Sequence, residues 1–555
     1  MAFNAKYDLQ CLTAAGIITS YQYPASSLCD PMVAENLLEE NHHPGEMSLE
    51  AICDRRFGHK KRKFMDAWRF GPNSKEFEGY AVDDVVWELK LWQFLKPLLE
   101  QNGLMQIFKK VLMPAACTIA DMEMVGIKWD LTQARRLLRG FQVLRDTLEK
   151  EVYKEIGHLN IASGDQVAKR LFDELGYSTR GIKTTASGKR LEVGEKAMEL
   201  LAKKYAVCDK ILGYRTAAKM VTTYVLPCTN WALADKERRI HGTFWLISTT
   251  GRIRGDKPNL QNIPSYVHKK EGFAGLKIKD AFIPRDGFAF LCLDYSQLEL
   301  RILAHVVQEP KFLKAYLTWG CTKCRKTGIS AVILHRCPEC GCEENEKALV
   351  GEKDCFWHGE DIHKQTTDKI KIFKGDRQLG KKLNFEAIYN AGGWKLNQVH
   401  PELSIDEWDE ALEEFFGPNG YPTIRRWHLY MEQQMKATRV CRDIFGRRRV
   451  IPKADLAKGY KHALNQFINF PIQAGACNLG LLCFSNIRKR CMELGVWLRE
   501  IFPTNWVHDE ILMEVVTKKA TEYAILVRDI METSVQLKVP IRADWKIVKN
   551  WGDAK

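Results

Sequence analysis

The sequence predicts an α+β protein with several domains, and three observations lead to this expectation. The chain has 555 residues, too many for a single hydrophobic core, so several domains are expected. A short apolar run at 288–293 ends abruptly in Asp294 and precedes a helical pattern, as a buried strand before a helix does. Between 130 and 225, apolar residues recur every three or four positions with lysine and arginine between them, which predicts long amphipathic helices.

A second acidic position interrupts a strand-turn-strand pattern at 506–516, where Asp509 stands on the turn. Asp294 ends its own predicted strand, so both carboxylates stand where the chain leaves an apolar layer. An Asp in front of a helix also serves as an N-cap. Two carboxylates delivered by separate strand ends, however, are what a two-metal phosphoryl-transfer site requires.

Net charge and cysteine content restrict the class of protein. The formal net charge is +14, from 83 Lys and Arg against 69 Asp and Glu, which favours a polyanionic partner such as nucleic acid. The 17 cysteines, without a secretory leader pattern at the start, indicate a reducing compartment and no disulfide framework. No run approaches the roughly 18 apolar residues of a membrane span. We therefore expect a soluble, cytoplasmic protein without a membrane partner.

Five sequence blocks carry a family resemblance. DYSQLELR at 294–301, RQLGKKLNFEAIY at 377–389 and VHDE at 507–510 resemble the three signatures of the family A DNA polymerases, the group of bacterial DNA polymerase I and its phage relatives. TGRIRGDKPNLQNIP at 250–264 and INFPIQAG at 468–475 resemble two further blocks. The resemblance implies a right-hand polymerase, with an antiparallel palm sheet and a helical thumb and fingers, preceded by a partial RNase H-like exonuclease domain.

The resemblance divides the chain into six parts. They are a partial 3′-5′ exonuclease-like domain (1–110), a connection and thumb (111–235), a palm segment with the first signature (236–310), a zinc-ribbon-like insertion (315–358), the fingers (359–440) and a palm segment with the third signature (441–555).

The N-terminal part resembles an exonuclease that has kept half of its site. Two of its motifs carry Asn4, Asp8, Tyr80 and Asp84. The family site needs a further Asp and Glu from an upstream strand, and the given sequence starts at Met1. We expect Asp8 and Asp84 to be vestigial surface carboxylates and this chain alone not to proofread. The alternatives are that a separate polypeptide supplies the missing strand, or that the given sequence begins at an internal start.

The acidic pair is the implied catalytic centre. By resemblance, Asp294 and Asp509 share two Mg²⁺ ions, and the backbone carbonyl of Tyr295 completes the second ion site. One ion lowers the pKa of the primer 3′-hydroxyl and the other neutralises charge on the leaving phosphates. Glu510 is either a peripheral ligand or structural. Glu299 blocks the ribose 2′-hydroxyl in the family, which implies a deoxynucleotide substrate.

The second signature predicts a helix that clamps the nucleotide. Arg377, Lys381, Phe385 and Tyr389 recur every four residues, so all four are expected on one broad helical face. An amphipathic helix with a snorkelling basic edge has the same spacing. The resemblance implies that Arg377 and Lys381 hold the phosphates, with Lys381 among the catalytic residues. It implies that Phe385 packs on the incoming sugar and base and that Tyr389 stacks at the template position. The remaining implied nucleotide contacts are Tyr295, Gln297, Glu299 and His363.

A further group of residues is implied at the primer-template duplex. Minor-groove acceptors are similar for every correct base pair, so a donor there tests shape without reading sequence. The implied residues are Arg252, Gln261, Asn469, Gln473 and His508.

A cysteine array that the family does not usually have stands between the first and second signatures. Cys321, Cys324, Cys337 and Cys340 form two Cys-x2-Cys pairs separated by twelve residues. Paired thiolates at this spacing close a tetrahedron around zinc, as in zinc ribbons, whereas the alternative is four unrelated reduced thiols. Four protein ligands leave no open position, so we expect a structural Zn²⁺ that staples an insertion of about 40 residues. Whether the insertion contacts template, a clamp or another replication protein stays open.

Together these features predict a template-directed DNA polymerase, a nucleotidyltransferase of phage DNA replication, active in the host cytoplasm if phage-encoded. Its expected partners are primer-template DNA and deoxynucleoside triphosphates, with a separate exonuclease fragment or a replication accessory protein as a further one. Two alternatives are kept. A single-subunit RNA polymerase shares the two Asp strands and a Lys-Tyr helix, but Glu299 and the PNLQNIP block argue against it. The other is an inert DNA-binding scaffold descended from a polymerase.

Overall fold

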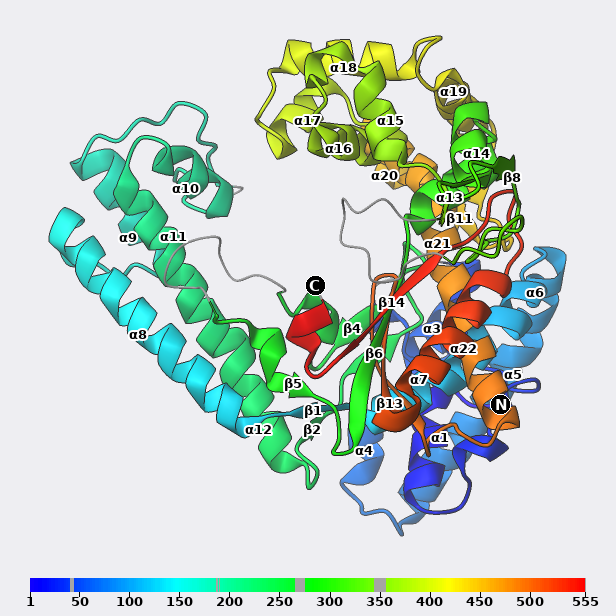
Figure 1. Ribbon diagram of the computed structural model, residues 1–555. Helices are drawn as coiled ribbons and strands as arrows, with labels where there is room; N and C mark the ends of the chain where they lie inside the picture. Colours follow the sequence, from blue (N-terminus) through cyan, green and yellow to red (C-terminus); the bar gives the residue numbers. More distant parts are fainter. Residues whose placement is uncertain (40–43, 186–187, 189, 265–274, 344–355, 555) are drawn as a thin grey trace.

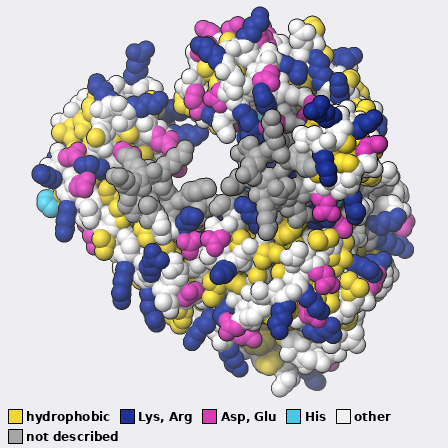
Figure 2. Space-filling model, viewed as in Figure 1, with side chains coloured by type: hydrophobic (Ala, Val, Ile, Leu, Met, Phe, Trp, Pro, Cys, Tyr) yellow, Lys and Arg dark blue, Asp and Glu magenta, His cyan; other side chains and the backbone are white. Residues whose placement is uncertain are grey.

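The computed structural model describes residues 1–39, 44–185, 188, 190–264, 275–343 and 356–554. A four-stranded sheet lies near the centre, two long helices extend from it to one side, and a separate helical lobe lies above it (Figure 1). The space-filling view shows an opening between the side helices and the upper lobe (Figure 2). This arrangement of palm, thumb and fingers confirms the predicted fold class.

The palm sheet is antiparallel, with strand order β12-β13-β6-β14. Its strands are β6 (Phe288–Tyr295), β12 (Ile501–Val507), β13 (Glu510–Val516) and β14 (Ala543–Val548). All residues from 289 to 293 in β6 are buried, which explains why this run is apolar without alternation. β12 and β13 form the predicted strand-turn-strand, and β14 lies at the edge of the sheet next to β6.

Three helices pack against this sheet or one another: α7 (Met113–Val125), α21 (Tyr460–Glu493) and α22 (Ala520–Thr533). The helix α21 is long and apolar enough to cross a membrane by length and composition, which the search for long apolar runs in the sequence missed. In the fold, 78% of its most apolar window is buried, as in the core helix of a globular protein.

The thumb is built on α8 (Leu131–Ile156) and α11 (Ala206–Lys219), which pack together. Asp130 begins α8 as an N-cap, because its Oδ1 accepts the backbone N–H groups of Thr132 and Gln133 at 2.7 and 3.2 Å. The thumb has a hydrophobic cluster of its own, separate from that of the palm. The predicted amphipathic helices are confirmed.

The fingers contain α15 (Ile362–Lys369), α16 (Arg377–Ile388), α17 (Gly393–Val399), α18 (Ile405–Phe416) and α19 (Pro422–Ala437). Helix α16 lies directly on α15 at Gly380, where a Cβ would stand 2.2 Å from Thr367 Oγ1 and 2.5 Å from the carbonyl oxygen of His363. The helix ends at Ile388, and Tyr389 is its C-cap residue. Arg377, Lys381 and Phe385 therefore lie within the helix, and Tyr389 lies at its C-terminal end.

The insertion forms a small three-stranded sheet of order β8-β7-β9, with β7 (Thr318–Cys321), β8 (Thr327–Ile329) and β9 (Phe356–His358). Within 315–343 and 356–358, the described residues of the insertion, the buried apolar cluster consists of Trp319, Cys321, Cys337 and Phe356. A core of this size supplies little stability without a staple.

The N-terminal region is helical in its described residues, 1–39 and 44–110, and has no strand there. Its main helices are α1 (Ala5–Ala14), which packs on α7, and α5 (Lys75–Gln101). These residues therefore represent the helical part of an exonuclease-like fold.

Candidate active site at one end of the palm sheet

The two acids predicted from separate signatures meet at the same end of the palm sheet. Asp294 is the last residue but one of β6, and Glu510 of β13 is its directly opposite partner. Asp509 precedes Glu510 on the turn, after His508 with a φ of 59°. Opposite residues in an antiparallel pair have Cβ atoms about 5 Å apart, which applies to Asp294 and Glu510. Asp509 directly precedes Glu510, so it lies at the same end of the sheet as Asp294. Asp294 is exposed and Asp509 half-buried, so both face accessible space.

Glu510 belongs to the support of this sheet end. It is 4% exposed, and its Oε1 accepts the indole N–H of Trp551 at 3.0 Å. Of the two roles left open by the sequence, the structure favours the structural one.

A pocket of about 490 Å³ opens beside the acidic pair and reaches the fingers. Most of its lining residues are ones that the sequence singled out, and they come from the palm and from the fingers helices α15 and α16. The lining consists of Arg252, Gln297, Leu298, Glu299, His363, Arg377, Lys381, Phe385, His508 and Asp509. The fold thus gathers cations, aromatic rings and the carboxylates of Glu299 and Asp509 around one space, whereas Asp294 is not among the lining residues.

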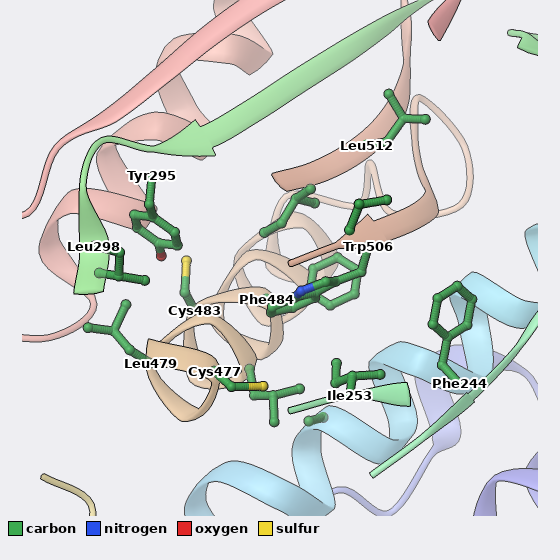
Figure 3. Close-up of a cluster of buried hydrophobic side chains, with 14 of the residues drawn as sticks. Phe244, Ile253, Tyr295, Leu298, Cys477, Leu479, Cys483, Phe484, Trp506 and Leu512 are labelled. Atoms are coloured by element: carbon green, nitrogen blue, oxygen red, sulfur yellow. The ribbon is translucent and has the colours of Figure 1, made fainter. Parts of the chain in front are cut away.

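A smaller pocket of about 190 Å³ adjoins it on the palm side. It shares Arg252, Glu299, His508 and Asp509 with the larger pocket and adds residues of the predicted primer-template group, among them Gln261 and Gln473. Its walls are continuous with an apolar cluster in which Tyr295, Cys483 and Leu298 lie together and Phe484 lies beside Trp506 (Figure 3). This end of the sheet therefore rests on a buried apolar cluster.

Glu299 is a meeting point of polar contacts that the sequence did not predict. Arg252 Nη2 donates to Glu299 Oε1 at 2.5 Å, and the hydroxyl of Tyr389 donates to Oε2. Burial, together with the charge of Glu299, raises the pKa of Tyr389 well above its usual value, so the hydroxyl keeps its proton. Arg252 and Tyr389, expected at the duplex and the template position, therefore hold the Glu299 carboxylate in this structure.

In the fingers, Arg377 and the start of the helix that bears His363 are held by Asp361, a contact that the sequence analysis did not predict. Asp361 caps α15 by accepting the His363 and Lys364 N–H groups, and its Oδ2 contacts Arg377 Nε at 2.5 Å. His363 is 2% exposed, and burial lowers its pKa to about 4, so the imidazole is neutral at pH 7. The Asp361 cap has a readable signal, an Asp directly before a helical pattern.

Of the residues predicted at the duplex, Gln261 lines the smaller pocket and Asn469 does not. Gln261 Oε1 accepts the Gly255 N–H at 2.6 Å and its Nε2 donates to the Trp506 carbonyl at 3.3 Å, so its side chain is fixed between two palm segments. Asn469 lies within α21 and lines neither pocket. Its buried Oδ1 has no hydrogen-bond partner among the described residues.

The four cysteines of the array come together as expected. Their sulfur atoms all lie within 4.8 Å of one another, with 3.7 Å between Cys321 and Cys340 and 3.5 Å between Cys324 and Cys337. Sulfurs of a tetrahedral site with Zn–S bonds of about 2.3 Å stand about 3.8 Å apart, so this donor set fits zinc.

The exonuclease-like residues do not assemble a metal cluster in the described part of the chain. Asp8 is exposed, whereas Asp84 contacts Lys61 Nζ, which also lies 4.4 Å from the ring of Tyr80. Burial, with the nearby Asp8, raises the pKa of Glu88 to about 7. Glu88 lies within the same motif as Tyr80 and Asp84, and Lys61 lies in a basic stretch at 54–71, but the sequence analysis assigned neither residue a role in this site.

Two known sequence families match the chain. DNA polymerase family A matches residues 132–320 and 345–553, and a 3′-5′ exonuclease family matches residues 1–100. The polymerase match covers more than half of the chain, and the gap in it contains all four cysteines of the array.

Bacterial proteins are similar over most or all of the chain. DNA polymerase I of Chloroflexus aurantiacus is 28% identical over 585 residues, covering 100% of this chain and 54% of its own length. The thermostable DNA polymerase I of Thermus filiformis is 29% identical over 492 residues, covering 86% of this chain and 52% of its own. The chain thus spans about half the length of these relatives.

A solved structure has a similar fold. The POL domain of Pol1 from M. smegmatis, in complex with DNA primer-template and dNTP, matches with a TM-score of 0.76 and 23% identity. The match covers 95% of this chain and 82% of that one. At this identity the likeness concerns the fold.

Proposed function

The chain belongs to DNA polymerase family A, and from this premise we propose that it is a template-directed DNA polymerase. It adds a deoxynucleotide to a primer 3′-hydroxyl and releases pyrophosphate. The observation that carries the proposal is the meeting of Asp294 and Asp509 at one sheet end, beside a pocket lined by Lys381 and Arg377. The fold neighbour that was solved with primer-template and dNTP supports the same substrates.

The metal ligands of the proposal are Asp294, Asp509 and the backbone carbonyl of Tyr295. Bound there, two Mg²⁺ ions lower the pKa of the attacking hydroxyl and stabilise charge on the leaving phosphates. Asp294 and Asp509 would hold these ions at the end of the palm sheet, beside the pocket that Asp509 lines. Glu510 keeps the turn that bears Asp509 in place through Trp551.

The fingers residues bind the triphosphate in this proposal. Lys381 and Arg377 lie one helical turn apart on α16 and line the same pocket as Asp509. Arg377 is held by Asp361, so a phosphate must share or replace that carboxylate. Phe385 lines the pocket and packs on the incoming sugar and base. Closure of α16 over a correct pair completes the site.

Glu299 selects the sugar. Its carboxylate is fixed by Arg252 and Tyr389, so it cannot swing away to admit a larger ribose. The proposed substrate is therefore a deoxynucleoside triphosphate.

The cysteine array holds a structural zinc ion in this proposal. The donor set is four thiolates at tetrahedral spacing, and the small core of the insertion needs such a staple. We expect one zinc per chain by elemental analysis, and loss of that zinc in Cys337→Ser.

Primer extension by matched variants tests the activity. Asp509→Ala removes several kcal/mol of transition-state stabilisation and should slow single-nucleotide incorporation on the order of 10³-fold or more. Asp286→Ala is the control, because this 98% exposed carboxylate stands on the turn before the opposite end of β6. Activity with ribonucleotides but not with deoxynucleotides would support an RNA polymerase, and no extension by the wild type would support an inert scaffold.

The phage-type role, the cytoplasmic location and the partner of the insertion stay predictions of the sequence. The exonuclease match extends over residues 1–100, which supports an exonuclease-like origin of this part.

A further inference from the structure

The insertion touches the palm through a histidine that the polymerase site does not use. His335 lies in the loop between β8 and β9, two residues before Cys337 of the array. Its Nε2 is 2.8 Å from Glu532 Oε2 on α22. The Glu532 side chain is only 6% exposed, so this contact is largely shielded from water.

Glu532 connects this contact to the catalytic strand. Its other oxygen, Oε1, accepts the backbone N–H of Ala543 at 3.0 Å. Ala543 is the first residue of β14 and the directly opposite partner of Tyr295, and the next pair is Asp544 with Asp294. One carboxylate thus joins the insertion to the strand end that carries the proposed metal ligands.

The same strand end is held from a second side. Arg301 is 4% exposed, and its guanidinium donates to the carbonyls of Ser296 and Pro540 at 2.7 and 2.6 Å. The Ser296 N–H donates to the Arg542 carbonyl at 2.9 Å. Arg301 thus joins the segment after β6 to the segment before β14, and Glu532 joins the start of β14 to α22. Of these two side chains, Glu532 is the one that contacts His335 of the insertion.

We propose that Glu532 is a positioning residue for the polymerase site and that His335, carried by the four-cysteine insertion, sets its orientation. This inference rests on the proposed two-metal polymerase function. Without His335, a largely buried carboxylate loses the partner of one oxygen, and such a group rotates toward solvent or another cation. The Ala543 N–H is then released, and the end of β6 that bears Asp294 and Tyr295 loosens. The array thereby acts on catalysis without touching substrate.

Divalent-metal affinity is the readout that separates positioning from general destabilisation. A merely destabilised enzyme has fewer active molecules but an unchanged Mg²⁺ concentration for half-maximal activity. Direct outer-shell partners of metal ligands contribute roughly 10- to 100-fold in affinity or activity. Glu532 acts one step further out, so His335→Ala and Glu532→Ala should each raise that Mg²⁺ concentration about five-fold. The KM for dNTP should change less than about two-fold in either variant, since no group that contacts the nucleotide is altered.

Three comparisons sharpen the test. Glu532→Gln keeps an oxygen for the Ala543 N–H and should recover part of the loss. Glu522→Ala, an exposed glutamate on the same helix, should match the wild type. Stripping zinc from the wild type with a mercurial and a chelating dye should give the same increase, and stripping His335→Ala should add nothing further, since both changes break one link.

Mn²⁺ binding followed by electron paramagnetic resonance gives a readout that needs no turnover. We expect the same five-fold weakening in His335→Ala and Glu532→Ala, with one zinc retained in each. Mn²⁺ and Mg²⁺ affinities equal to those of the wild type in both variants would overturn the inference. If the wild type is inactive but the two variants still bind Mn²⁺ more weakly than it does, the polymerase function is overturned. The proposed effect of His335 and Glu532 on the metal site then still holds.

Discussion

At the scale of single residues, Glu299 is the carboxylate on which the selectivity of the site depends. Two side chains from distant parts of the chain, Arg252 and Tyr389, hold it in one orientation. Arg252 supplies charge, and Tyr389 supplies a hydroxyl whose pKa is far above neutrality. Because both oxygens of the carboxylate are hydrogen-bonded, the Glu299 side chain keeps one position and excludes a sugar with a 2′-hydroxyl sterically.

Removing this carboxylate should admit ribonucleotides. Glu299→Ala is expected to lower the preference for dNTP over rNTP on the order of ten- to a hundred-fold, the range for one steric or hydrogen-bonding group. The measurement is the ratio of kcat/KM for the two nucleotides on one primer-template. Tyr389→Phe, which removes only the hydroxyl bond, should lower the ratio less. An unchanged ratio in Glu299→Ala would remove Glu299 from sugar selection.

The residue roles show where sequence reasoning stops. Asp294 and Asp509 could be predicted because each follows a strand pattern. Both also lie in family signatures, DYSQLELR and VHDE. The contacts of Glu299, the pairing of Arg377 with Asp361 and the contact between Glu532 and His335 join residues of separate segments, and no sequence pattern indicates which residues pair. Only the fold brings such pairs together.

At the scale of elements, α16 lies on α15 because Gly380 has no side chain. A Cβ there would meet Thr367 Oγ1 at 2.2 Å and backbone at 2.5 Å. Gly380→Ala must therefore push the two helices apart, and overpacking of this kind is expected to lower the free energy of unfolding by about 1–3 kcal/mol.

Urea denaturation and nucleotide kinetics check this prediction. We expect a lower urea midpoint and a raised KM for dNTP, because Lys381 follows Gly380 directly on α16. Gly392→Ala is the control, since nothing lies within 4 Å of the Cβ position there. Equal midpoints for both variants would contradict the packing argument.

The end of α16 also carries a pH-dependent support. His428 is 3% exposed, its Nε2 lies 2.9 Å from the Ile388 carbonyl oxygen, and burial lowers its pKa to about 4. The folded pKa is below the unfolded value of about 6.5, so the unfolded chain binds this proton more tightly. The stability contribution is complete above about pH 6.5 and is lost as the pH falls toward 4, in total about 3 kcal/mol.

Unfolding at pH 7 and pH 5 tests the sign of this effect. The test is the difference between two proteins: over this interval His428→Gln, which can still donate to the Ile388 carbonyl, should lose less stability than the wild type. Carboxyls whose pKa is raised by burial, such as Glu88 and Asp443, gain stability as the pH falls, but they do so equally in both proteins. His363 shifts in the same direction, so part of the loss should persist in the variant. The exposed His158→Gln is the control. A pH dependence identical in His428→Gln and the wild type would refute the assignment.

The architecture could be predicted further than its details. The apolar run of β6, the strand-turn-strand of β12 and β13 and the thumb helices follow from periodicity and burial. The end of α16 before Tyr389 did not follow, because the four-residue spacing continues past the helix. The apolar α21 was not recognised as membrane-like in composition, because short polar interruptions divide its apolar run.

At the scale of the whole molecule, charge governs the encounter with nucleic acid. The formal net charge is +14, and Lys and Arg side chains are spread over thumb, palm and fingers in the view of Figure 2. Neutralised phosphates release condensed counterions, so binding to primer-template should weaken with salt.

Fluorescence anisotropy with a labelled primer-template measures this dependence. If roughly six to ten phosphates are contacted, the affinity should fall on the order of 10³- to 10⁵-fold between about 50 and 200 mM salt. An affinity that stays constant over this range would exclude backbone phosphates as the main partners of the basic surface.

The central claim is that Asp294 and Asp509 together hold the divalent ions of nucleotide transfer. Its most direct test is the number of Mn²⁺ ions bound to a complex with a dideoxy-terminated primer-template and a dNTP, counted by electron paramagnetic resonance. The account predicts two ions for the wild type and for Asp286→Ala, and fewer for both Asp294→Ala and Asp509→Ala. Two tightly bound ions in either active-site variant would contradict it.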